Sequence, residues 1–149
     1  MVSMDYRKLG DSYYIRMDRD DEIVAAILDV CRREGVSSAT FSGIGGCQNA
    51  EIQVFCPERG EFETERVEGL LELVSLAGNV ISRDDGELAH HVHALFAYQD
   101  AEGHRIAAGH LKSSVVLYTA EIELRPVVNG VIGASLNPET NTYFWDFRA

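Results

Sequence analysis

Positive charge is scarce in this chain of 149 residues. It has 13 Lys and Arg residues against 24 Asp and Glu residues, which gives a formal net charge of −11. Proteins that bind nucleic acid without sequence preference use Lys and Arg to neutralise phosphates, so this balance argues against direct contact with DNA or RNA. An acidic surface still permits a basic protein partner, although acidity more often serves solubility.

A long apolar segment is also missing. No stretch approaches the roughly 18 uncharged apolar residues of a membrane-spanning helix, and the first residues lack the apolar segment of a secretory leader. We therefore expect a cytoplasmic protein that does not enter a membrane. Hydrophobic residues make up 46% of the chain, enough for one core in a single domain over residues 1–149.

Cysteines are few. Cys31, Cys47 and Cys56 show no C-x-x-C spacing and are odd in number, so a disulfide framework is not expected. We predict that all three are reduced and serve mainly in packing. For Cys47, a second interpretation is that its thiol is a metal ligand.

One helix is predicted after the acidic run 18–22. Ile23, Ala26, Ile27, Val30 and Cys31 recur at spacings of three and four residues, which is typical of an amphipathic helix. Gly35 is placed to end it in a left-handed cap.

The rest of the chain has the alternation of strands. About eight short strands are predicted, with polar turns at 84–87 and 100–103. They cover residues 12–17, 38–42, 50–56, 62–67, 70–81, 88–98, 106–110 and 115–124. A glycine-rich turn is expected at 43–46, and it lacks the third glycine of a dinucleotide-binding loop. The aromatic end, residues 143–145, is expected to cover the core or to dock on another subunit. The predicted class is α+β, mostly antiparallel sheet with one long helix.

Three histidines suggest a metal site. His91 and His93 are two apart in a predicted strand, so they share a face while His90 points to the other side. His110 follows one predicted hairpin later. Three imidazoles on one ion leave a fourth position open for water or substrate. Histidines in strands also serve simply as hydrogen-bonding groups, so the pattern alone leaves both interpretations open.

Glu72 is the conspicuous carboxylate of the predicted strand 70–81. If that strand lies beside the histidines, Glu72 is a candidate fourth ligand, general base or partner that orients an imidazole. A carboxylate in solvent or in a cross-strand ion pair is the plain alternative.

Five runs of the sequence resemble the plants-and-prokaryotes conserved (PPC) domain, over roughly residues 10–147. They are Phe41-Ser-Gly-Ile-Gly-Gly, Glu68-Gly-Leu-Leu-Glu-Leu-Val-Ser-Leu-Ala-Gly-Asn79, His91-Val-His-Ala94, Ala108-Gly-His-Leu111 and Thr119-Ala-Glu-Ile122. The resemblance implies a compact α+β fold that forms a homotrimer. In prokaryotes the domain stands alone, and in plant nuclear proteins it is joined to AT-hooks, which this chain lacks.

Carried over residue by residue, the resemblance implies a divalent metal, zinc in the first instance, on His91, His93 and His110. His90 stands where the family commonly has another residue, so it is a bystander or an added ligand. Ala108 replaces a usual glycine, and Leu70-Leu71 stand where an aromatic residue is frequent.

Two functions then compete. In the first, the protein is a metal-dependent enzyme or a small-molecule sensor. As an enzyme it would be a hydrolase or lyase that uses metal-activated water, with Glu72 as the proton shuttle. In the second, it is a non-enzymatic assembly or interaction module, related to DNA-binding regulators only by kinship, because family does not fix function.

Overall fold

The computed structural model describes residues 4–147, and its one helix within that range is the predicted one. Helix α1 (Ile23–Glu34) buries the five apolar residues named above. Glu22 caps its start by accepting a hydrogen bond from the backbone N–H of Ala25, at 2.6 Å. Gly35 ends the helix with φ 66°, a left-handed conformation that glycine adopts without steric cost. No helix among the described residues is long and apolar enough to cross a membrane.

Eight strands are present in residues 4–147, but several are much longer than predicted. Strands β3, β4 and β6 run for 18, 22 and 24 residues, each joining two of the predicted short strands. Irregular pairing bends them without ending them. The strands are β1 (Asp5–Leu9), β2 (Ser12–Met17), β3 (Ala39–Cys56), β4 (Glu61–Ser82), β5 (Leu88–Asp100), β6 (Gly103–Pro126), β7 (Gly133–Asn137) and β8 (Thr142–Asp146). Strands β1, β7 and β8 were not predicted.

The predicted glycine turn at 43–46 is wrong, because these residues lie inside β3. A Cβ atom at Gly43 would lie 2.3 Å from the backbone oxygen of Glu121, and one at Gly45 would lie 2.6 Å from that of Thr119. The glycines therefore let β3 and β6 approach closely. Close packing of two strands, and not a turn, is thus the role of these glycines.

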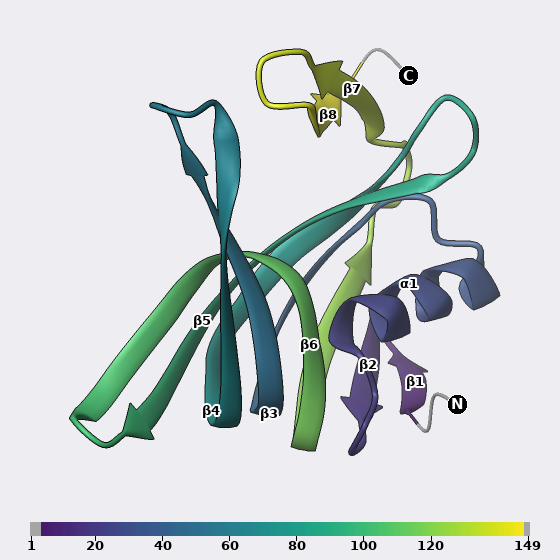
Figure 1. Ribbon diagram of the computed structural model, residues 1–149. Coiled ribbons are helices and arrows are strands. Elements are labelled where there is room, and N and C mark those ends of the chain that lie inside the picture. The colour runs from purple at the N-terminus through teal and green to yellow at the C-terminus, as the bar shows by residue number, and fades with distance from the viewer. Residues whose placement is uncertain (1–3, 148–149) are drawn as a thin grey trace.

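The sheet is antiparallel apart from one bridge between β4 and β7, and it curves strongly (Figure 1). Strand β5 pairs with both β4 and β6, which also pair with β3, so these four strands form a closed ring. Helix α1 packs against β6. The helix and the strands share one core, in which Phe96 is fully buried. The domain is thus mostly strand with one helix, as the predicted class requires.

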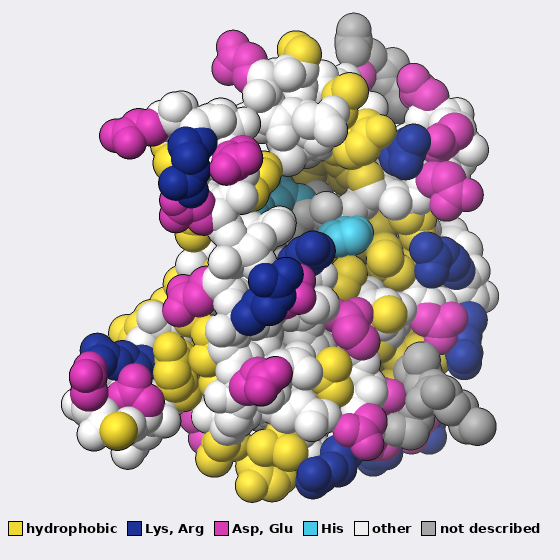
Figure 2. Space-filling view, in the orientation of Figure 1, with side chains coloured by type: hydrophobic (Ala, Val, Ile, Leu, Met, Phe, Trp, Pro, Cys, Tyr) yellow, Lys and Arg dark blue, Asp and Glu magenta, His cyan; other side chains and the backbone are white. Residues whose placement is uncertain are grey.

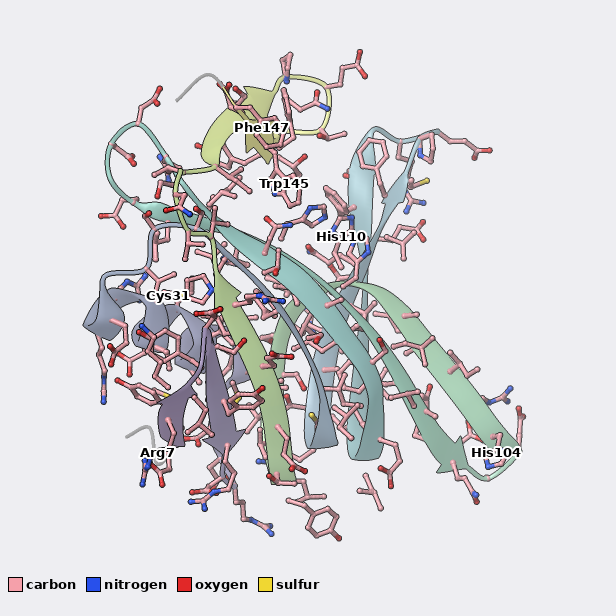
Figure 3. All side chains as sticks on the ribbon, turned by 180° about the vertical axis from the view of Figure 1, so that it is seen from behind. Arg7, Cys31, His104, His110, Trp145 and Phe147 are labelled. Atoms are coloured by element: carbon pink, nitrogen blue, oxygen red, sulfur yellow. The ribbon has the colours of Figure 1, made fainter. Side chains whose placement is uncertain are left out.

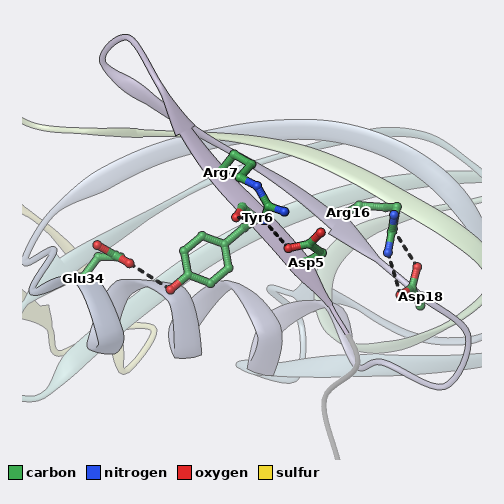
Figure 4. Close-up of polar contacts among 6 residues, drawn as sticks. All are labelled: Asp5, Tyr6, Arg7, Arg16, Asp18 and Glu34. Carbon is green, nitrogen blue, oxygen red and sulfur yellow. Dashed lines mark hydrogen bonds and ion pairs between the residues drawn. The ribbon is translucent and has the colours of Figure 1, made fainter.

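Polar contacts tie the N-terminal hairpin to the end of the helix (Figure 4). The hydroxyl groups of Tyr6 and Tyr13 donate to the carboxylate of Glu34, at 2.8 and 3.2 Å. Arg16 donates to Asp18 from Nε at 2.9 Å. The two tyrosine contacts hold β1 and β2 against α1, and the Arg16 contact joins the end of β2 to the loop that follows it.

The three cysteines are free. Cys31 and Cys47 are fully buried, and burial raises the pKa of the Cys31 thiol to about 11 and also raises the pKa of Cys47. Cys47 lies between Leu71 and Val116 in the core. It is not part of the histidine cluster, so the structure does not support it as a ligand.

Candidate metal centre

His91, His93 and His110 meet on one face of the β5–β6 hairpin. His93 and His110 are direct cross-strand partners, and His91 lies two residues before His93 on the same face. One ring nitrogen from each of the three lies within 4.8 Å of those of the other two. The ring centroids are 4.5 Å apart for His93 and His110, 5.0 Å for His91 and His93, and 5.1 Å for His91 and His110. The structure therefore brings together all three histidines singled out in the sequence.

Gly109 sets the position of His110. It has φ +152°, and a Cβ atom there would lie 2.7 Å from the backbone oxygen of Gln53 and 2.9 Å from Cγ2 of Ile52. Only glycine fits where β6 passes this close to β3. In the Gly-His dipeptide, the glycine is thus required by the close approach of the two strands, and the histidine that follows it places its imidazole on the hairpin face.

His90 does not join the cluster. It pairs with Val80 across the β4–β5 ladder and offers no ligand atom to the three-histidine group. Burial lowers the pKa of His90, and the carboxylate of Glu22 opposes this shift. Of the two roles considered for His90, the geometry favours that of bystander.

Glu72 is not brought to the histidines. It pairs with Ala97, whereas His93 pairs with Ala77, five positions further along β4. At about 3.3 Å per residue this separates them by roughly 15 Å. Glu72 instead lines a cavity with Tyr98 and His104, and Figure 3 shows His104 at the far end of the hairpin from His110. The proposed role of Glu72 as ligand or proton shuttle therefore does not fit this register.

Two of the clustered histidines, His91 and His110, favour the neutral form. Burial lowers the pKa of His91 and of His110, and the neighbouring histidines lower both further. A neutral imidazole keeps the electron pair that binds a metal, whereas a protonated one has lost it. The donor set of three nitrogens also suits zinc.

Asn79 supplies a second observation that fits a metal. It is the cross-strand partner of His91, so the two side chains stand beside each other on one face. Its Oδ1 atom is buried and accepts no hydrogen bond in the described structure. A histidine that binds metal through one nitrogen almost always donates its other N–H to an acceptor, and Oδ1 of Asn79 is available for this. Sequence reasoning missed Asn79, because its place depends on strand register.

Two cavities flank the histidines, and residues of the C-terminal hairpin β7–β8 line part of each. One, of about 300 Å³, includes His91, His110, Lys112 and Tyr143, and the other, of about 340 Å³, includes His91, His93, Asn79 and Trp145. Figure 2 shows histidine side chains inside this hollow. In Figure 3, Trp145 lies between the hairpin and His110.

Comparisons with known proteins agree on the fold. Three solved structures are similar over nearly the whole of both chains. A plant- and prokaryote-conserved protein from Pyrococcus horikoshii is 29% identical, with a TM-score of 0.79 over 100% of this chain and 97% of that one. A metal-containing protein from Archaeoglobus fulgidus is 25% identical, with a TM-score of 0.79 over 98% and 99%. A candidate DNA-binding protein from Bacteroides thetaiotaomicron is 23% identical, with a TM-score of 0.86 over 98% and 99%.

No curated protein sequence matches the chain. Residues 4–128 match the model of the Plants and Prokaryotes Conserved (PCC) domain, the domain abbreviated PPC above. That range includes all three histidines and leaves out the β7–β8 hairpin. The chain therefore belongs to the family of the Plants and Prokaryotes Conserved domain, as the resemblance of its motifs predicted.

Proposed function

We propose that the protein binds one divalent metal ion per chain, zinc in the first instance, through His91, His93 and His110. The observation that carries this proposal is the grouping of three imidazole nitrogens within 4.8 Å of one another. The free acceptor on Asn79 supports it. The A. fulgidus relative, described as metal-containing, supports it as well.

Three protein ligands would leave one side of the ion open, and this supports a role in binding a small molecule or water. Three protein ligands leave a coordination position at which zinc supplies Lewis acidity to a small molecule or activates water. Within residues 4–147, no Asp or Glu lines either of the two cavities beside the histidines. A carboxylate base is therefore not at hand within one chain, and the geometry supports metal-dependent binding of a small molecule better than hydrolysis.

Elemental analysis of protein purified without a tag or chelator tests this proposal. The parent should contain about one zinc per chain after reconstitution, and the His91→Ala/His93→Ala double variant should contain none. His104→Ala is the matched control, because this histidine is exposed on the same hairpin but lies outside the cluster. Absence of metal from the reconstituted parent, or equal metal in the double variant, would overturn the proposal.

We propose a homotrimer as the state in which the domain works. Ile44 and Tyr118 are 56% and 66% exposed on the β3–β6 part of the sheet, and Val74 on β4 is 50% exposed. Exposed apolar groups of this kind mark surfaces for association, and the family resemblance points to three copies. Direct binding to DNA is not part of the proposal, because the net charge of −11 opposes it.

Sedimentation equilibrium tests the assembly. The parent should have the mass of three chains, and Tyr118→Glu should shift it toward the monomer by placing a charge in the contact. Val128→Glu is the control, since Val128 is 68% exposed after the end of β6. A monomeric parent would rule out the trimer.

A further inference from the structure

The β7–β8 hairpin is held over the histidine cluster at one end. Gly133 bridges to Ser82 of β4, and the N–H of Ile132 donates to Oγ of Ser38 at 3.2 Å. The guanidinium of Arg83 lies 5.2 Å from the ring centroid of Tyr143, a cation–π contact. These contacts fix where the hairpin stands relative to the histidines.

Strand β8 turns two aromatic rings toward the cavities. Tyr143 and Trp145 alternate with Phe144, so they share one face of the strand. Tyr143 lines the cavity beside His110, and Trp145 lines the cavity beside His93. Phe144 lines neither cavity and is 52% exposed. The hairpin therefore presents an apolar, aromatic surface to anything bound over the histidines.

The two cavities differ from the acidic chain as a whole in the charged residues that line them. The chain has 24 Asp and Glu residues, yet none of those described lines either cavity. Lys112 lines the cavity beside His110. Its Nζ atom lies 3.6 Å from Glu51, a carboxylate already paired with Arg66 at 2.9 Å. With a divalent ion on the histidines and Lys112 beside them, the cleft would carry positive charge and attract an anion.

We propose that the β7–β8 hairpin completes a binding site for a small organic anion over the three histidines, and that Trp145 selects an apolar or aromatic group on that anion. This inference rests on the proposed metal site and adds the class of ligand to it. An acidic oxygen of the ligand occupies the open side of the cluster, near Lys112. The apolar part packs beneath Trp145, where burial and ring contact favour it.

Trp145 makes the test direct, because it is the single tryptophan of the chain. The zinc-loaded full chain is titrated with mandelate, which has a carboxylate, a hydroxyl and a phenyl group. Lactate lacks the phenyl group, and mandelamide lacks the charge. Mandelate should change the fluorescence of Trp145, and calorimetry should show it binding about tenfold more tightly than lactate. Mandelamide should bind more weakly than mandelate.

Two variants test whether the preference depends on the aromatic ring that faces the cavities or on any aromatic ring of strand β8. In Trp145→Ala the preference for mandelate over lactate should fall to about one, with zinc content and lactate affinity unchanged. In Phe144→Ala, which removes an aromatic ring from the opposite face of the same strand, the preference should persist. Equal loss in both variants, an unchanged preference in Trp145→Ala, or equal binding of mandelamide and mandelate would overturn the inference.

Zinc content, measured in every sample, keeps the two proposals apart. A parent that holds zinc but shows no dependence on Trp145 refutes the role of the hairpin and leaves the metal site standing. A parent that holds no zinc refutes the metal site, and the anion site is then refuted with it.

Discussion

His93 and His110 face each other directly across the β5–β6 ladder, with ring centroids 4.5 Å apart. This pair forms the base of the cluster, and His91 completes it from one side. A cross-strand pair is held by the backbone hydrogen bonds of the ladder, so its two imidazoles are placed before any metal arrives. Preorganisation of this kind favours tight binding.

We expect His110→Ala to lower zinc affinity by at least about 100-fold, since a lost ligand costs more than the 10- to 100-fold of a lost partner of a ligand. Competition titration with a chromophoric chelator measures this. His90→Ala is the matched control, because His90 lies on the same hairpin but outside the cluster. A large loss of affinity in His90→Ala would show that His90 is a ligand.

Asn79→Leu should weaken zinc binding by about 10- to 100-fold, because the N–H of His91 would lose its acceptor. Asn79→Asp keeps an acceptor oxygen at the same place and should preserve or increase the affinity. The same chelator titration compares them. Equal affinities in the parent and in Asn79→Leu would remove Asn79 from the site.

Gly109→Ala should displace His110 and destabilise the fold by about 2 kcal/mol, because the added methyl group would meet the backbone of β3. Zinc affinity should fall with it. Ala108→Gly, at the preceding exposed position, should cost no more than about 1 kcal/mol and leave zinc binding intact. Urea unfolding and zinc titration of both variants provide the measurements.

Gly45→Ala should destabilise the domain by about 2 kcal/mol or more, since its Cβ would lie 2.6 Å from the backbone oxygen of Thr119. Gly46→Ala is the control. There the nearest atom is Cδ2 of Tyr118 at 3.3 Å, and a side chain shifts by a few tenths of an ångström more easily than backbone, so the cost should be smaller. Similar stability of the two variants would contradict the close approach of β3 and β6.

Acid should destabilise the metal-free protein. The pKa values of His90, His91 and His110 are lowered from their ordinary value of 6.5 in the folded chain. As pH falls below 6.5 the unfolded chain therefore binds protons first, which favours unfolding. The contribution of these groups is fully present above that pH and is lost as pH falls toward their folded pKa values. Zinc affinity should fall in the same direction, since protons compete for the ligand atoms.

Urea unfolding between about pH 7 and about pH 5 measures this dependence. The His91→Ala/His110→Ala variant should show a shallower decline than the parent. Stability that rises on acidification through this range would contradict the lowered pKa values.

The helix and the histidine cluster could be predicted because their signals are local. The helix has an apolar period over its 12 residues, and its caps, Glu22 and Gly35, directly flank it. The histidines lie on adjacent strands of one hairpin, so alternation and one turn are enough to bring them together. A site whose residues lie on the two strands of one hairpin can therefore be predicted from the sequence.

What could not be predicted depends on register and on contacts distant in sequence. Glu72 lies on a neighbouring strand as expected, yet the pairing places it beside Ala97 and not beside a histidine. Gly43 and Gly45 are typical of a turn in the sequence. Their place inside a strand follows from the close approach of β6, which leaves no room for a side chain. Asn79 was missed because the register of β4 against β5, which places it beside His91, is not visible in the sequence. The C-terminal strands alternate weakly and pair mainly with each other.

All three imidazoles stand within residues 91–110, on a single hairpin. Such a hairpin closes in about 1–10 μs, well before distant strands find their partners. The proposed ion would therefore meet these histidines on the nascent chain, ahead of the pairing of β3 with β6. Metal supplied during synthesis would then favour the correct register of this hairpin and so guide the order in which the ring of strands is assembled.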